Sequence, residues 1–251
     1  MTGSARWLGL VASLVLVGVG VAITQQAKLG YDNTPMQPDG KWRIHDGTRP
    51  QPVMVTPGPS AGMAAPPSDA VVLLGPDGSL SAWQGTGGKP AAWPSSGGVV
   101  QTGVGSGTIE TKESFGDVQL HVEFATPSEV KGDSQGRGNS GVFLAGVFEI
   151  QVLDSYNNPT YPDGQAAAMY GQFPPLVNAS RPPGEWQAYD ITLIGRRVTV
   201  VLNGQTVIDS EVIPGITGGA IDSNESEPGP LMLQGDHGKI SFRNVTVTPA
   251  Q

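Results

Sequence analysis

Two polar side chains that could take part in catalysis or binding share one face of a predicted strand. Between residues 148 and 153, apolar residues alternate with Glu149 and Gln151. This is the period-2 pattern of a strand with one buried and one open face. A carboxylate can exchange a proton with a ligand, and a neighbouring amide can hold that ligand by hydrogen bonds. We therefore expect Glu149 to be catalytic and Gln151 to bind substrate, with Asp154 as a further carboxylate at the strand end.

Two histidines are further candidates for acid and base chemistry. His121 and Glu123 fall on the same open face of the alternating strand 118–124, where both could reach a ligand or a metal ion. His237 follows Asp236 in a turn flanked by glycines, an arrangement that can orient an imidazole as a base. Each histidine could instead be a hydrogen-bonded structural residue. No metal ligand set can be assigned from these residues.

Three residues are candidates for holding a ligand. Arg137 and Asn139 lie in a loop whose glycines allow close approach of the backbone, so the loop could be a ligand clamp or only a turn that enters a strand. Tyr170 lies in the irregular stretch 155–185, and loops of this length are usually functional or disordered. We expect Tyr170 to stack on a ring or donate a hydrogen bond to a carbonyl.

Composition limits the classes of function. The 251 residues include 36 Gly and 22 Pro with 14% charged residues, which suits one medium-sized domain with appendages. A formal net charge of -8 disfavours nucleic acid as a partner and leaves neutral ligands such as sugars. Because there is no cysteine, disulfides, thiol nucleophiles and Cys-ligated zinc are excluded.

Three regions follow one another along the chain. Residues 1–27 contain an uncharged apolar segment, Trp7 to Ile23, which we interpret as a signal peptide or an uncleaved membrane anchor, so that the rest is expected outside the cytoplasm. Residues 28–68 form a lead-in rich in Pro and Gly, in which 56–68 is a tether and 41–52 an ordered strip over the domain surface. Residues 69–251 form the globular domain.

The domain is predicted to be all-β. No stretch after residue 30 has helical periodicity with caps, and Asn203-Gly204 predicts a tight hairpin turn of the primed type. These patterns predict an antiparallel sandwich of about a dozen strands, with one sheet face packed and another open. The expected strands are 70–74, 80–83, 99–101, 107–111, 118–124, 142–144, 148–152, 186–194, 197–202, 205–209, 231–234 and 240–247.

Several segments in order resemble a known family. RGNSGVFL, FEIQVLDSY, MYGQFPPLVNASRPPGEWQAYDI and LMLQGDHGKISFRNV are similar to the 3-keto-disaccharide hydrolase family of secreted bacterial proteins. The upstream KWRIHDGTRPQP and DAVVLLGPDGSLSAW are similar to the lead-in of many members. The resemblance covers nearly everything after residue 30, and it implies a concanavalin-like jelly-roll sandwich of two antiparallel sheets.

The resemblance also implies a reaction. Its substrates would be glycosides oxidised at C3, whose ketone acidifies the C2 proton, so that a base can start elimination of the C1 substituent and water can then add. Such chemistry needs a base, an acid and an enolate stabiliser, either hydrogen-bond donors or a divalent cation. In the family motif Gln234 and Asp236 would be adjacent, but here Gly235 separates them, which is expected to shift His237.

Two other functions remain open. A sandwich of this kind could be a carbohydrate-binding module without turnover. Glu149, Gln151 and Asp154 also resemble the Glu-x-Asp-x-x-Glu strand of β-glucanases, although Gln151 replaces a carboxylate that such an enzyme needs. For an enzyme on either route, we expect the strand of Glu149, the strand of His121, the Tyr170 loop and the His237 turn to converge on one pocket.

Overall fold

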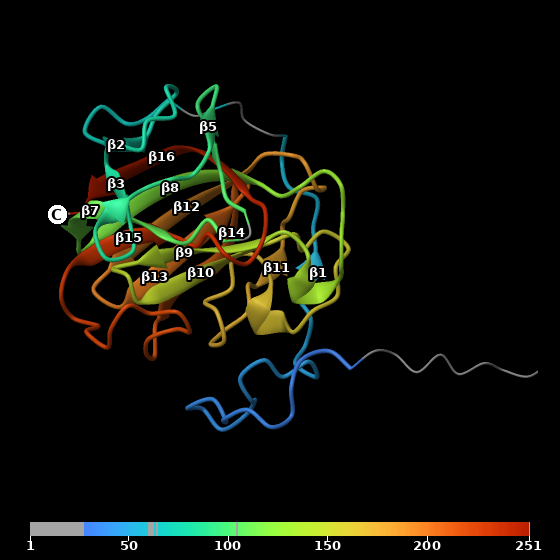
Figure 1. The fold of residues 1–251 in the computed structure, drawn as a ribbon. Coiled ribbons are helices and arrows are strands. Elements are labelled where there is room, and N and C mark those ends of the chain that lie inside the picture. Colours follow the sequence, from blue (N-terminus) through green and yellow to red (C-terminus); the bar gives the residue numbers. More distant parts are fainter. Residues whose placement is uncertain (1–27, 60–62, 64, 104, 251) are drawn as a thin grey trace, which may run out of the picture.

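The structure is a sandwich of two antiparallel sheets, as the alternating segments predict (Figure 1). The computed structural model describes residues 28–59, 63, 65–103 and 105–250. In spatial order, the smaller sheet contains β10 (Phe148–Leu153), β9 (Asn139–Leu144), β15 (Gly229–Leu233), β7 (Ile109–Phe115), β3 (Trp83–Gly85) and β4 (Lys89–Pro90).

The larger sheet has eight strands, and a separate short pair lies beside the sandwich. In spatial order, the larger sheet contains β14 (Gln205–Val212), β13 (Arg197–Leu202), β12 (Gln187–Ile194), β8 (Val118–Ala125), β16 (Ser241–Pro249), β6 (Val99–Gln101) and β5 (Ser95–Ser96), with β2 (Val71–Leu74) also paired to β16. The separate pair joins β1 (Val53–Met54) and β11 (Val177–Asn178) in parallel. The helical elements of the described chain are the 3-10 turns η1 (Ser134–Gly136) and η2 (Pro162–Gly164).

The core lies between the two sheets and is filled by the apolar side chains that alternate along each strand. Phe124 of the larger sheet packs on Tyr189 with ring centroids 4.7 Å apart, and both side chains are fully buried. Burying each large side chain stabilises the fold by roughly 1.5–3 kcal/mol. The Tyr189 hydroxyl donates across the core to the main-chain oxygen of Gln151 at 2.6 Å. The larger sheet therefore helps to fix β10, the strand that carries Glu149.

Strand positions agree with the sequence patterns to within a few residues. The segment 197–202 is β13, and 118–124 is β8 extended by one residue. Asn203 and Gly204 both have positive φ, 54° and 80°, as a primed hairpin turn requires. Four two-residue strands went unpredicted because segments this short carry no alternation. The expected N-terminal hydrophobic segment lies outside the described residues, and no helix of the described chain is long and apolar enough to cross a membrane.

One expectation about β10 is wrong, because the face that carries Glu149 is not open. All six residues of β10 are buried. β10 is an edge strand, and residues 166–170 run along its free edge, where Gln151 N donates to Ala168 O at 3.0 Å and Tyr170 N to Glu149 O at 3.0 Å. Unpaired strand edges are usually covered in this way. The face itself is covered by residues from more distant segments, among them Tyr170, Gly218 and His237.

Candidate active site

A small cavity of about 140 Å³ lies against the buried carboxyl group of Glu149. It brings together six of the residues expected to act or bind, from two strands, a long loop and a turn. The cavity is lined by Asn139, Glu149, Gln151, Tyr170, Gly218, Gly219, Gln234 and His237. Residues far apart in the chain thus converge here.

The Glu149 side chain is held in a space that a glycine provides. Glu149 points away from the core, toward Gly141 on the neighbouring strand β9. A Cβ atom at position 141 would overlap the carboxylate and lie 2.9 Å from the Cγ and Cδ atoms of Glu149. The residue is 3% exposed, and loss of hydration on burial raises the pKa of Glu149 to about 8. A carboxylate with this pKa is a competent general base near neutral pH.

Amide groups form one wall of the cavity. Gln151 Nε2 donates to Gln135 Oε1 at 2.8 Å, and Asn139 Nδ2 donates to the main-chain oxygen of Gln135 at 3.0 Å. The Oε1 atom of Gln151 is buried and has no hydrogen-bond partner among the described residues. Leaving a buried acceptor unsatisfied costs about 1–3 kcal/mol, so a ligand hydroxyl at this position would be stabilised.

Tyr170 provides a neutral phenol beside the carboxyl group. Its main-chain N–H bonds the Glu149 carbonyl, and its hydroxyl lies 2.9 Å from that of Tyr161. Burial raises the pKa of Tyr170, and the charge of Glu149 adds to the effect. The phenol therefore stays protonated and can donate a hydrogen bond into the cavity.

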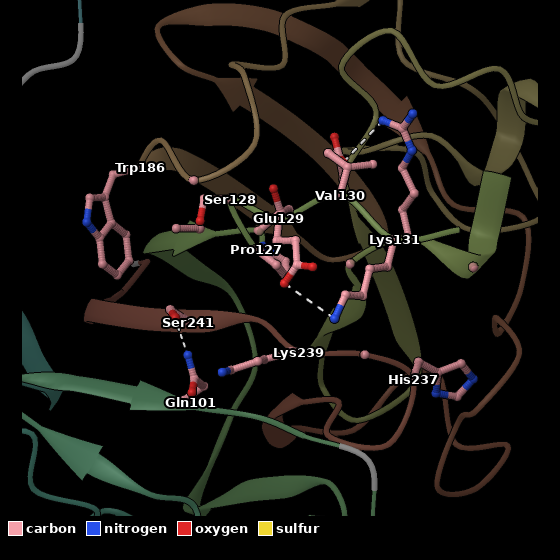
Figure 2. A pocket seen from close by; sticks show the side chains of 18 residues that line it. Gln101, Pro127, Ser128, Glu129, Val130, Lys131, Trp186, His237, Lys239 and Ser241 are labelled. Carbon is pink, nitrogen blue, oxygen red and sulfur yellow. Dashed lines mark hydrogen bonds and ion pairs between the residues drawn. The ribbon is translucent and has the colours of Figure 1, made fainter. Parts of the chain in front are cut away.

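His237 lies where the small cavity meets a larger one of about 770 Å³. Its Nδ1 atom is 2.8 Å from Asp236 Oδ1, and about half of its side chain is exposed. Figure 2 shows the larger cavity with His237 at one end and Trp186 at the other. One imidazole can therefore reach groups bound on either side.

Gly235, which lies between Gln234 and Asp236, is held by a neighbouring loop. A Cβ atom at position 235 would overlap the carbonyl oxygen of Gly107, so this approach requires glycine. The main-chain oxygen of Gly235 accepts a hydrogen bond from Ser106 Oγ at 2.7 Å. With the additional residue packed against this loop, both Gln234 and His237 line the small cavity.

The expectation that His121 and Glu123 join this pocket is not met. Both lie on β8 of the larger sheet, with side chains on its outer face, whereas Glu149 lies outside the smaller sheet, across the core. His121 Nδ1 is 2.7 Å from Asp190 Oδ1, and Glu123 accepts a hydrogen bond from Arg243 at 2.6 Å. Burial is the largest single effect on the pKa of His121 and lowers it. The carboxylates of Asp190 and Glu123 together outweigh burial, so the pKa is raised. Alternation gives the face of a strand but not the sheet that the strand joins.

Arg137 and Asp154 line the larger cavity rather than the one at Glu149. They form an ion pair at 3.2 Å, and Arg137 also donates to the main-chain oxygen of Tyr156 at 3.2 Å. Burial raises the pKa of Asp154, and the guanidinium opposes this effect. The guanidinium thus has a structural partner. Asp236 contacts the site through His237.

Four further residues shape the site and were not predicted. Gln135 orients two cavity amides, and Thr217 Oγ1 accepts a hydrogen bond from the main-chain N–H of Glu149 at 2.8 Å. Gly218 and Gly219 line the cavity, and Gly219 has a φ of 83°. The Gly-Gly pair in a turn-rich segment was a usable signal, because such pairs permit close backbone approach.

The cavity holds few charged groups that could bind a divalent cation. The cavity offers one carboxylate, one imidazole and neutral amide and phenol groups. In the part of the chain that the structure describes, no group of three or more His, Cys, Asp or Glu residues could hold a metal ion. With three amide carbonyl oxygens but a single carboxylate, this set offers a hard cation little compensating charge, so it holds such an ion weakly. The chemistry of this cavity is therefore expected from its side chains.

Comparisons with known proteins agree with this picture. A 40% identical protein of known structure from Parabacteroides distasonis ATCC 8503, provisionally assigned as a glycosyl hydrolase, covers 80% of this chain and 93% of its own, with a TM-score of 0.68. Two more from that organism, 19% and 24% identical, have TM-scores of 0.59 and 0.52. They cover 73% and 72% of this chain and 94% and 99% of their own, and they show the fold alone.

The family follows from the sequence itself. No curated protein matches the chain. The family pattern described as a 3-keto-alpha-glucoside-1,2-lyase-like domain matches residues 69–248, which is most of the chain. The chain therefore belongs to the 3-keto-alpha-glucoside-1,2-lyase-like domain family, which is carbohydrate-active.

Proposed function

We propose that the protein cleaves 3-keto-glycosides by elimination across C1 and C2, followed by hydration. The observation that carries this proposal is the Glu149 carboxyl group, which is buried in a small cavity and has a pKa of about 8. Proton abstraction next to a ketone needs a positioned base and hydrogen-bond donors for the enolate, and a base whose pKa lies near the working pH is efficient in this role.

The first step removes the C2 proton. Glu149 takes it, and the electrons of the C2–H bond move toward C3 to form an enolate whose charge lies on the C3 oxygen. Tyr170 and the cavity amides lie on the lining around this carboxyl group and can donate to that oxygen. Donors that are already in place stabilise such charge more than water does.

The second step breaks the bond between C1 and the leaving oxygen. His237 in its protonated form, held by Asp236, gives a proton to that oxygen and leaves an enone across C1 and C2. Water then adds its hydroxyl to C1 as His237 removes a proton, and Glu149 returns its proton to C2. The net result is hydrolysis, with both side chains restored.

The position of His237 indicates where the leaving group would lie. Because His237 lines both cavities, a substituent released from C1 beside it would extend into the larger one. Trp186 offers an aromatic surface there, with Arg243 stacked 3.9 Å from its ring centroid. We propose that the oxidised ring occupies the small cavity and the leaving group the larger one.

The glucanase alternative is disfavoured by the position of the second carboxylate. Glycosidases of that kind need two carboxyl groups on either side of the scissile bond. Here Asp154 is paired with Arg137 at the other cavity, and Gln151 takes the middle position of the strand pattern. Glu149 therefore works with neutral donors.

The test is incubation with a chromogenic aryl 3-keto-glucoside. The protein should release the phenol and exchange the C2 hydrogen for deuterium in D₂O, and Glu149→Gln should lose both activities. A matched unoxidised glucoside should remain intact. Binding without release or exchange would overturn the proposal and favour a carbohydrate-binding module, while cleavage of the unoxidised glucoside would favour a glucanase.

A further inference from the structure

Residues 28–55, here named the lead-in strip, lie against the loop that carries Tyr170. The strip precedes residues 69–248, which match the family. Figure 1 shows it in blue to cyan at the foot of the domain, continuing into β1 beside β11. It contacts the domain at the loop of residues 155–178, which follows β10. The contacts that it makes there are specific.

The strip binds this loop at points on both sides of Tyr170. The buried Nε2 atom of Gln37 donates to the main-chain oxygen of Gly171 at 2.8 Å, the residue directly after Tyr170. Arg49 donates to the main-chain oxygen of Gln172 at 3.2 Å. Further contacts are Gln51 Nε2 to Thr160 O at 3.0 Å, Gln165 Nε2 to Gln51 Oε1 at 2.8 Å, and the pairing of β1 with β11.

A buried carboxylate in the loop depends on the strip. Asp163 is fully buried, and its Oδ2 atom accepts the main-chain N–H of His45 at 2.9 Å. Its other side-chain contacts among the described residues are His45 Nδ1 and Arg49 NH1, both at 3.4 Å. Removing one partner of a buried charge is strongly destabilising. The strip thus completes the environment of the loop.

His45 packs directly on the two tyrosines of the loop. Its ring centroid lies 4.3 Å from that of Tyr161 and 4.8 Å from that of Tyr170, and these tyrosines are joined by their hydroxyl groups at 2.9 Å. His45 has a φ of 58°, an uncommon conformation for a residue with a side chain, and its N–H bond to Asp163 maintains it. The imidazole therefore fixes the orientation of the phenol that lines the cavity.

We propose that the lead-in strip supports the active site through the loop that carries Tyr170, and that His45 is a positioning residue that acts through Tyr170. The strip holds the loop, His45 holds the two tyrosine rings, and Tyr170 presents its hydroxyl beside Glu149. The role of the Tyr170 hydroxyl in this inference rests on the proposed function. The packing of His45 on the two tyrosine rings does not depend on it. The strands of both sheets lie within residues 71–249, so the strip contacts the loop rather than completing either sheet.

The test uses the full chain with His45→Ala, His45→Phe and the exposed control Lys41→Ala. His45→Ala should lower kcat by about 10- to 100-fold with little change in KM, because small displacements of a positioned group have effects of this size. His45→Phe keeps a ring and should restore most of the rate, and Lys41→Ala should match the parent. If His45 acts through Tyr170, His45→Ala should add no further loss to Tyr170→Phe.

Amide hydrogen exchange tests the packing independently of turnover. His45→Ala should speed exchange in residues 160–178 and leave the strands of both sheets protected. Additive losses in the double variant, unchanged exchange in 160–178, or faster exchange throughout the sandwich would each overturn the positioning role. If the parent protein releases no aryl group, the proposed function fails while the exchange result still decides whether His45 holds the loop.

Discussion

The raised pKa of Glu149 couples the proposed chemistry to the stability of the fold. Its ordinary value is 4.5, and burial raises it to about 8 in the folded protein. A carboxyl group with a raised folded pKa stabilises the fold fully below its unfolded pKa, and this contribution is lost as pH rises through the folded pKa. Between pH 4.5 and about 8, the parent protein should therefore lose stability that Glu149→Gln keeps.

The magnitude follows from the gap between the two pKa values. At 1.36 kcal/mol per pH unit, the gap between 4.5 and about 8 corresponds to at most about 5 kcal/mol. Urea unfolding of both proteins between pH 4 and pH 9 measures the effect, and other titrating groups cancel in the difference because both proteins contain them. The free energy of unfolding of Glu149→Gln minus that of the parent should rise across this range.

A flat difference would refute the reasoning. A rise of less than about 1 kcal/mol would mean that Glu149 titrates near its ordinary value. The same group should control the rate, since only the carboxylate can accept the C2 proton. At pH 6, two units below the folded pKa, the rate of C2 hydrogen exchange in D₂O, the step that needs only Glu149, should be about 1% of its plateau. A midpoint near 4.5 would contradict both the burial argument and the role as base.

Four further substitutions test individual parts of the site. Gly141→Ala should displace the Glu149 carboxylate and lower kcat/KM for aryl release about 10-fold or more, with an unchanged circular dichroism spectrum; full activity would contradict the close packing. Tyr170→Phe should lower kcat about 100-fold with KM nearly constant in steady-state assays, as expected for an enolate donor, and an effect on KM alone would contradict that role. His121→Ala should leave kcat/KM within about twofold, because a distant side chain has no contact with the cavity, and a large loss would link the two outer faces. Gln151→Glu should move the pH–rate midpoint above about 8, since a second carboxylate disfavours ionisation of Glu149, and an unmoved midpoint would place the two side chains too far apart to interact.

The sequence predicted the strands well because local alternation depends on the immediate neighbours of each residue. It placed Glu149 and Gln151 on one face correctly, but the residues that cover that face, among them Tyr170, Gly218 and His237, are distant in sequence. His121 has the same local pattern as Glu149, yet the two strands join different sheets. Which sheet a strand joins depends on long-range pairing, such as that of β15 with β9.

The amide at position 151 fits proton abstraction better than displacement at C1. A carboxylate there would lie in the same small cavity as Glu149 and would raise the cost of ionising it. It would also lose the donor that now bonds Gln135, and with it one of the contacts that order the amide wall. With an amide there, the cavity carries one negative charge in total, on Glu149 before the proton transfer and on the enolate after it, where the phenol and amides can stabilise it. The residue that departs from the glucanase pattern is thus the one that lets a single buried carboxylate act as a base.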